Sequence, residues 1–317
     1  MSASFDQPAR ASDRPSLRYP MHALTRQQLI LLVLLTVVWG LNWPIMKLGV
    51  TGFPPLTFRA LCMWIGLPVL AVALKIKGIP FRIAREHWKE VALLAVANMF
   101  FWHALVVLAV QSLSSGRAAI LGYTMPIFSA LIGALVFGQR LPSRAWGGVA
   151  AAALGVVLLL WHEITALSGR PTGVAMMLVA ACTWALGTQL MRRTTLPYLT
   201  LTIAFWMTVL TTLWMSGLAT VFEQDRWAMP SLPVWGSIVY NAIGVFAFAQ
   251  VAWLALARSL PPIASTLSVM MIPVLGVFSG AWWLGEILHW QDWTAVALVM
   301  FAILTVLLPA RAKGADA

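Results

Sequence analysis

Polar side chains inside long apolar runs are the residues of this sequence whose types could do chemistry. They are uncharged or titratable, and they comprise Asn42, Asn98, His103, Gln189, Asn241 and Gln250. Within a membrane such groups mostly hydrogen-bond between helices, each contributing about 0.6 kcal/mol. A binding site, by contrast, needs only a few oriented polar groups in a mostly apolar pocket. The set is predicted either to join helices or to converge on a solute, in the second case through Asn42, His103, Asn241 and Gln250.

His103 is the titratable side chain placed well inside an apolar run. Imidazole changes its charge between about pH 5 and pH 8, so a histidine at this depth could exchange protons. The alternative is a neutral histidine that hydrogen-bonds to a neighbouring helix. Both interpretations place His103 among other helices rather than on the surface.

Lys47 and Arg59 are the two basic residues that fall within apolar runs, each near an end of its run. A charge at the bilayer centre costs about 2.5–3.5 kcal/mol on insertion scales, whereas a charge near the interface can extend its side chain to water at lower cost. The alternative is a basic vestibule that favours anionic or zwitterionic solutes bearing a carboxylate. No acidic residue lies at mid-depth in a run to neutralise the two cations.

Aromatic and proline residues at depth complete the candidate set. An indole there either packs between helices or stacks on a planar solute, and Trp39 and Trp184 are the best candidates for the second role. Tyr123 joins them because its hydroxyl needs a partner at that depth. Pro126 and Pro273 fall about midway along their runs, where each removes a backbone hydrogen bond and kinks a helix. They are predicted to act as hinges or to line a cavity, with simple packing kinks as the alternative.

Catalysis, metal binding and ATP-driven pumping have no support in the sequence. An enzyme needs a nucleophile with its base, paired carboxylates or a cluster of ligands. The five histidines and two cysteines show no His-x-x-x-His or Cys-x-x-Cys spacing, and no G-x-x-x-x-G-K-[ST] loop is present. We therefore expect neither an enzyme nor a cofactor or metal.

The composition assigns these residues to membrane-spanning helices. Of 317 residues, 61% are apolar and 10% are charged, against about 45–50% and about 25% in soluble domains. Spanning segments must be helices or closed barrels, and these runs are too uniformly apolar for barrel strands. The predicted fold is all-α, with ten transmembrane helices near 28–50, 54–75, 89–111, 114–137, 145–162, 172–191, 198–222, 234–257, 260–284 and 290–309.

Basic residues predict the orientation of the chain. The net charge is +11, but the Lys and Arg residues fall between the runs, which argues for membrane topology and against nucleic-acid binding. Sixteen lie on the side of both termini and three on the other side. The positive-inside rule therefore predicts cytoplasmic tails at 1–27 and 310–317 in a multi-pass membrane protein.

Two halves, 28–162 and 172–309, are predicted to be copies of one five-helix unit. An offset of 147 residues aligns Pro126 with Pro273, Gly133 with Gly280 and Gly138 with Gly285; an offset of 145 aligns Trp39 with Trp184. Because five is odd, the second half must enter the membrane from the opposite face. Inverted repeats of this kind are common in secondary transporters.

Three motifs in this order resemble the EamA-type members of the drug/metabolite transporter superfamily. They are Trp39-Gly-Leu-Asn-Trp-Pro-Ile-Met-Lys47, Ser115-Gly-Arg-Ala-Ala-Ile-Leu-Gly-Tyr-Thr-Met-Pro126 with Phe137-Gly-Gln-Arg-Leu141, and Pro262-Ile-Ala-Ser-Thr-Leu-Ser-Val-Met-Met-Ile-Pro273 with Leu284-Gly-Glu-Ile-Leu288. The resemblance implies ten helices in two inverted halves, cytoplasmic termini, and export or exchange of small metabolites through a central cavity. The sequence departs from the family at Gln139, where a glutamate is usual, whereas Glu286 keeps the family residue.

The sequence therefore predicts a secondary transporter that exports or exchanges small metabolites such as amino acids by alternating access. The predicted solute is anionic or zwitterionic. One alternative is the efflux of cationic drugs, against which the lack of a deep carboxylate argues. A second alternative, from another class, is a membrane enzyme or a scaffold without transport.

Overall fold

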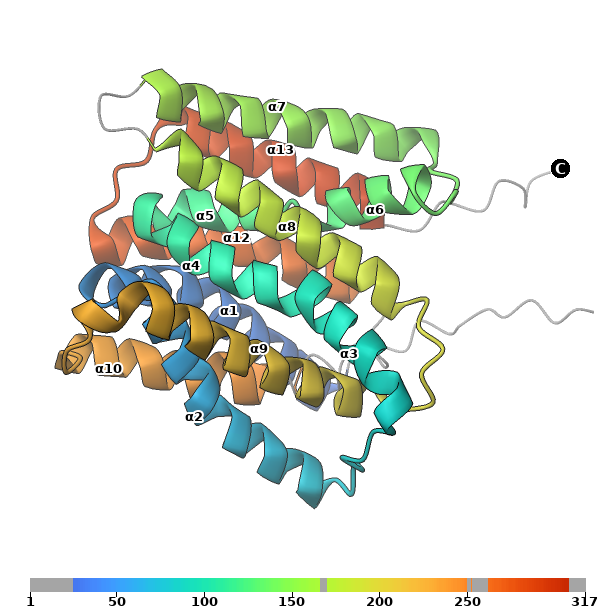
Figure 1. Ribbon diagram of the computed structural model, residues 1–317. Helices are drawn as coiled ribbons and strands as arrows, with labels where there is room; N and C mark the ends of the chain where they lie inside the picture. Colours follow the sequence, from blue (N-terminus) through green and yellow to red (C-terminus); the bar gives the residue numbers. More distant parts are fainter. Residues whose placement is uncertain (1–24, 166–169, 250–251, 253–261, 308–317) are drawn as a thin grey trace, which may run out of the picture.

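The computed structural model describes residues 25–165, 170–249, 252 and 262–307. Within the last range it describes the side chains of residues 270–306. Its helices lie roughly side by side in one bundle, and their ends gather at two opposite faces (Figure 1). Large apolar side chains such as Val72, Leu135 and Trp282 are exposed on the outside of the bundle. Such a surface is suited to contact with lipid rather than water.

Eight helical stretches in the described residues are long and apolar enough to cross a membrane. Five of them are single helices: α1 (Arg26–Gly52), α2 (Pro55–Ile76), α7 (Ser143–Thr165), α8 (Pro171–Met191) and α9 (Thr200–Glu223, extended by the 3-10 turn Gln224–Arg226). The other three are interrupted. Two further helices, α12 (Pro262–Leu284) and α13 (Trp290–Leu307), are apolar over Met270–Leu284 and Trp290–Val306.

Local sequence signals explain where several helices begin. Thr25 and Gln28 exchange side-chain and backbone hydrogen bonds at the start of α1, which forms a capping box. Pro55 and Pro171 stand at the first positions of α2 and α8, where a missing N–H costs nothing. The apolar runs of the sequence therefore become helices with boundaries within a few residues of those predicted.

The fourth span is broken into two helices, α5 (Ser115–Gly122) and α6 (Met125–Leu135). The prediction that Pro126 kinks one continuous helix is therefore wrong, because Pro126 lies in the first turn of α6, directly after the break. The Thr124 hydroxyl donates to the Leu121 carbonyl at 2.6 Å and helps to close the turn. Pro273, by contrast, does lie inside α12.

The third and eighth spans each contain π-helical backbone. The third consists of the 3-10 turn Arg85–His87, α3 (Trp88–Ala95), the π-helix η2 (Val96–Phe100) and α4 (Phe101–Ser112). The eighth consists of α10 (Leu232–Val239) followed by the π-helix η4 (Tyr240–Ala249). π-Helical segments are rare and frequently mark functional sites.

Two glycine turns that the sequence aligns have the same backbone conformation. Gly138 follows α6 with φ 65° and Gly285 follows α12 with φ 67°. In each turn the next residue donates its backbone N–H to the glycine six residues earlier, Gln139 to Gly133 at 2.9 Å and Glu286 to Gly280 at 3.4 Å. A positive φ favours glycine, so the aligned glycines are explained by the helix endings they form.

The two ends of the bundle differ in charge. We call the end with the α4–α5, α7–α8 and α12–α13 connections the acidic end, because Glu163, Glu223, Glu286 and Asp292 lie there. The opposite end, with the α2–α3, α6–α7 and α8–α9 connections, is the basic end; its cations include Lys75, Lys77, Arg82, Arg85, Lys89, Arg140, Arg144, Arg192 and Arg193.

Carboxylates close the acidic end by capping helices and pairing with a buried cation. Glu223 accepts the backbone N–H groups of Leu56 and Thr57 at the start of α2, at 3.1 and 2.8 Å. Glu286 accepts the backbone N–H of Ser115 at the start of α5, at 2.6 Å. Because the capped helix and the carboxylate are far apart in sequence, each contact ties two distant segments together.

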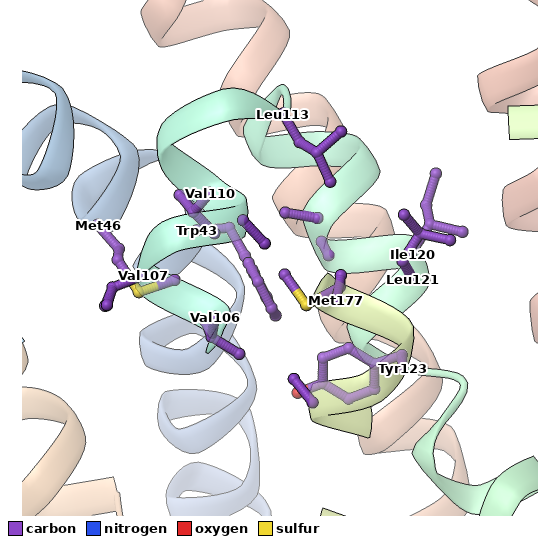
Figure 2. Packing of buried hydrophobic residues seen from close by; sticks show 14 of the residues in the cluster. Trp43, Met46, Val106, Val107, Val110, Leu113, Ile120, Leu121, Tyr123 and Met177 are labelled. Carbon is purple, nitrogen blue, oxygen red and sulfur yellow. The ribbon is translucent and has the colours of Figure 1, made fainter. Parts of the chain in front are cut away.

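The main core is one cluster of buried apolar side chains from both halves of the chain, including Met46 and Leu121 from the first half and Met177 from the second (Figure 2). Close approach also occurs where Gly187 of α8 meets η2. A Cβ atom added at Gly187 would lie 2.3 Å from the Cα of Asn98. This glycine is therefore required by the packing of α8 against the π-helix.

We predict that Gly187→Ala lowers the free energy of unfolding by about 1–3 kcal/mol, because overpacking forces two helix backbones apart. The matched control is Gly217→Ala in α9, where an added Cβ meets nothing within 4 Å, and where alanine favours the helix. Thermal unfolding in detergent measures both variants. Equal melting temperatures for the two would contradict the close packing of α8 on η2.

Candidate functional site

A cavity of about 640 Å³ lies among α1, α4, α6, α8 and η4. Its lining includes Gln139, Arg140 and Leu141 of the α6–α7 connection and Arg192 at the end of α8. These residues belong to the basic end, so the cavity reaches from that end into the interior of the bundle. The size is within the range of small-molecule sites, about 300–1,000 Å³.

Seven of the residues singled out from the sequence line this cavity, and they come from both halves of the chain. They are Trp39, Asn42, His103, Tyr123, Pro126, Trp184 and Gln189. The break between α5 and α6 explains how Tyr123 and Pro126 reach it, because irregular backbone at membrane depth is tolerated where it lines a cavity. The structure therefore brings together residues that lie up to 150 positions apart, about half of the spanning sequence.

Aromatic side chains form much of the wall. The rings of Trp102 and Trp184 lie 5.3 Å apart between centroids, tilted by 55°. The rings of Trp43 and Tyr123 lie 6.4 Å apart in an edge arrangement, and both residues belong to the core cluster of Figure 2. Such faces offer apolar, planar contact area to a solute.

Two polar atoms of the lining residues have no hydrogen-bond partner among the described residues. They are Oδ1 of Asn42 and Nδ1 of His103, and both are buried. Unpaired buried polar atoms cost free energy, about 1–3 kcal/mol each, unless a ligand or water satisfies them. Both atoms are therefore available to hydrogen-bond with another molecule, and convergence on a solute stays a prediction for Asn42 and His103.

Other polar residues of the set hold helices together. The amide nitrogen of Gln189 donates to the carbonyl and hydroxyl of Ser129, at 2.6 and 3.0 Å. The amide nitrogen of Asn98 donates to the carbonyl of Trp184 at 3.1 Å. Gln189 and Asn98 therefore follow the interhelical interpretation, although Gln189 also lines the cavity.

Lys47 lies outside the cavity and caps α4. Its ammonium donates to the carbonyls of Val110, Gln111 and Leu113, at 2.9, 2.9 and 2.8 Å. The expectation that this side chain only extends to water is therefore wrong. It lines, with Glu286, a second depression of about 480 Å³ at the acidic end.

We predict that Lys47→Met lowers the free energy of unfolding by about 1.5–3 kcal/mol, the range for hydrogen bonds to charged groups. The loss arises because the three carbonyls at the end of α4 lose their shared donor. Lys77→Met, which removes an exposed cation at the basic end, is the control and should leave the melting temperature unchanged. A Lys47→Met protein as stable as this control would show that the cap contributes nothing.

Arg59 is buried, with 3% of its surface exposed, so the predicted extension to water is wrong for this residue too. Its guanidinium donates to Sδ of Met46 at 2.7 Å and contacts Oδ1 of Asn241 at 3.5 Å. Asn241 is fully buried and donates to the Ser237 carbonyl at 3.0 Å. Neither Arg59 nor Asn241 lines the cavity, but Asn241 belongs to η4 and Arg59 contacts it, and η4 contributes Phe246 to the lining.

Two further predictions concern Gln250 and Pro273. Gln250 lies outside the described residues. Pro273 lies in α12 away from the cavity lining. In the described part of the chain, no group of three or more His, Cys, Asp or Glu side chains could hold a metal ion.

The charge of the cavity is positive or neutral throughout the described lining. Arg140 and Arg192 stand at the basic end of it, His103 lies deeper, and no aspartate or glutamate is among the described lining residues. A cation in a low-dielectric site needs a counter-charge, and the described lining offers it no carboxylate.

Sequence reasoning missed several lining residues. Thr188 and Arg192 follow Trp184 at intervals of four, which places the three on one face of α8. This spacing could have identified them. Met99 and Phe246 were not predictable, because they reach the cavity from π-helical segments.

Comparisons with known proteins give the family. The EamA-like transporter family model matches residues 27–161 and 171–308. The chain is 27% identical to the inner membrane transporter YedA of Escherichia coli K12 over 86% of this chain and 88% of the relative. It is 24% identical to the transporter YoaV of Bacillus subtilis over 78% of this chain and 86% of the relative.

A more distant relative and a solved structure complete the comparison. A probable amino-acid metabolite efflux pump of Escherichia coli K12 is 26% identical over 52% of this chain and 53% of the relative. A crystal structure of a protein with 20% sequence identity superposes with a TM-score of 0.65, covering 90% of this chain and 99% of the other. The fold, the ordered motifs and the family match agree, and the chain belongs to the EamA-like transporter family, as a membrane transporter.

Proposed function

We propose that the protein is a secondary transporter of a bacterial inner membrane that exports or exchanges small metabolites by alternating access. Ten spanning helices would form two inverted five-helix halves, 28–162 and 172–309, between tails at 1–27 and 310–317. The family model matches each half separately, and the glycine turns at Gly138 and Gly285 have the same conformation. These two observations support the repeat.

Helix contacts support an exchange of the halves. α1, which opens the first half, packs against α12, and α8, which opens the second half, packs against α5 and α6. Likewise α8 packs against α4, and α1 packs against α10 and η4. A two-fold axis between the halves would convert each of these helix contacts into its counterpart. If the two halves exchange conformations, the same site opens to the opposite face of the membrane.

The observation that carries the proposal is a cavity open at one end and closed at the other. The lining reaches Arg140 and Arg192 at the basic end. At the acidic end Glu286 is bonded to Ser115, which ties the α12–α13 connection to α5. In the repeat-related turn, Gln139 lines the cavity instead. We propose that this is the state open to the cytoplasm, with both termini at the basic end.

The proposed solute is anionic or zwitterionic, such as an amino acid. The described lining holds cations and unpaired polar atoms but no carboxylate. The relative named as a probable amino-acid metabolite efflux pump supports the same class. The carboxylate of Glu286, which a cationic drug would need, is held at the start of α5 instead of in the cavity.

Release of radiolabelled amino acids from vesicles loaded with a wide panel tests the proposal. The test variant is Ala130→Trp, which fills the cavity. The matched control is Ala150→Trp, which places the same side chain on the exposed face of α7. We expect flux in the unmodified protein and in Ala150→Trp, and its loss in Ala130→Trp. No flux for any solute of the panel, or equal flux in both variants, would contradict transport through this cavity.

A further inference from the structure

Arg59 is a buried cation without a paired carboxylate. It is 3% exposed, and among the described residues no aspartate or glutamate forms an ion pair with it, unlike Arg117, which pairs with Glu163 and Asp292. Its terminal nitrogens contact the Met46 sulfur and, at 3.5 Å, the Asn241 amide oxygen, and its Nε has no hydrogen-bond partner among the described residues. Arginine keeps its charge in proteins, so this guanidinium is poorly compensated as it stands.

Phe246 separates this guanidinium from the cavity. The Arg59 Cζ lies 5.5 Å from the centroid of the Phe246 ring, and the His103 ring lies 5.3 Å from it. Phe246 and His103 both line the cavity, whereas Arg59 does not. A rotation of one aromatic side chain would therefore join Arg59 to the cavity.

Unpaired atoms on three helices complete the arrangement. Nε of Arg59 on α2, Nδ1 of His103 on α4 and Oδ1 of Asn42 on α1 are all buried without partners, and the three helices contact one another. Asn42 lies one helical turn before Met46, the residue that Arg59 contacts. Two nitrogen atoms and one acceptor oxygen match a carboxylate with an adjacent ammonium, the head group of a zwitterion.

We propose that Arg59 is the counter-ion for the anionic group of the solute and that Phe246 is the side-chain gate between them. This inference rests on the proposed function and names the residue that selects charge. A carboxylate entering from the basic end displaces the Phe246 ring and accepts hydrogen bonds from Nε and a terminal nitrogen of Arg59. His103 with its proton on Nδ1 donates to the second oxygen. The position of Phe246 on the π-helix η4 places the gate on irregular backbone.

Thiol modification tests the charge that Arg59 projects, without requiring transport. Phe246→Cys is prepared in a Cys62→Ala/Cys182→Ala background in nanodiscs. The rate of thiol modification is measured with two methanethiosulfonate reagents, the anionic ethylsulfonate and the cationic ethyltrimethylammonium. Each rate is divided by the rate at which the same reagent modifies a small free thiol. Any effect of Arg59 on thiolate formation changes both rates equally and cancels in their ratio.

We expect the anionic-to-cationic ratio to exceed that of the free thiol by about ten-fold. Arg59→Met should abolish the excess and Arg59→Lys should retain most of it. Arg192→Gln, at the basic end of the cavity, should reduce it less than Arg59→Met. Elution of each variant as a single monodisperse species confirms folding. A ratio equal to that of the free thiol, a ratio unchanged by Arg59→Met, or no reaction at all would overturn the proposal.

A second thiol tests the gate. Asn42→Cys is compared with Phe246 present and with Phe246→Ala, in the same background. Removal of the ring should raise the preference for the anionic reagent several-fold, and Arg59→Met should cancel the increase. An unchanged preference would overturn the gate. If no solute is transported but the modification ratio still depends on Arg59, transport alone is refuted. If solutes are transported but the ratio does not depend on Arg59, this inference alone is refuted.

Discussion

Replacing Arg117 with methionine is expected to lower the free energy of unfolding by about 3–5 kcal/mol, because it leaves two buried carboxylates without a cation. The Arg117 guanidinium pairs with Glu163 of α7 and, at 2.7 Å, with Asp292 of α13. Glu163 is 6% exposed and Asp292 is 3% exposed. The ion triad therefore joins three helices at the acidic end. Thermal unfolding in detergent measures the loss.

The triple variant Arg117→Met/Glu163→Gln/Asp292→Asn is the control for this prediction. It removes all three charges, so its stability should recover a large part of the loss. Recovery is limited because Glu163 and Asp292 also accept backbone hydrogen bonds from Arg170 and His289, at 2.7 and 2.8 Å. A triple variant less stable than Arg117→Met would show that unpaired charge is not the cause.

Glu286→Gln is expected to open the acidic end. The Glu286 carboxylate accepts hydrogen bonds from the backbone and hydroxyl of Ser115, at 2.6 and 2.8 Å, and from the backbone of Gly116 at 3.2 Å. A neutral amide removes the negative charge at the start of α5 and accepts fewer hydrogen bonds. The free energy that holds the acidic end closed should therefore fall by about 1.5–3 kcal/mol. The modification rate of Tyr123→Cys by a membrane-impermeant reagent applied at the acidic end should rise about ten- to hundred-fold.

Glu90→Gln is the matched control, because it removes the same charge from α3 at the basic end, where Glu90 accepts from Thr194. Its Tyr123→Cys rate from the acidic end should stay at the level of the parent. An equal rise in both variants would indicate general loosening of the bundle. No rise in Glu286→Gln would contradict the role of Glu286 in closing this end.

Much of the fold could be predicted, because long apolar runs have a single stable form in a membrane. The boundaries of α1, α2, α7 and α8 follow the runs within a few residues, and capping residues such as Thr25 determine the starts. The ninth and tenth spans stay predictions, since the apolar stretches described there are shorter.

The candidate site was less predictable, because its geometry depends on partners far along the chain. Lys47 and Arg59 looked alike in sequence, as cations near the ends of apolar runs. One caps α4, 63 to 66 residues away, and the other faces an amide 182 residues away. Nothing in the sequence indicated that Glu163 and Asp292, 46 and 175 residues from Arg117, pair with this buried arginine.

The π-helices were also invisible to sequence reasoning. An apolar run has the same composition whether its backbone is α-helical or π-helical, so η2 and η4 could not be distinguished from their neighbours. The break between α5 and α6 was predicted only in part. Pro126 indicated irregular backbone, but not that a new helix begins there. The packing of distant helices determines both features.

The central claim is that one cavity opens to the two faces of the membrane in turn. Ser129→Cys, whose parent residue lines the cavity, measures this directly when impermeant reagent is applied separately to right-side-out and inside-out vesicles. We predict fast modification from the basic end, slow modification from the acidic end, and a reversal of the two rates in Glu286→Gln. Fast modification from both ends at once, or none from either, would contradict alternating access.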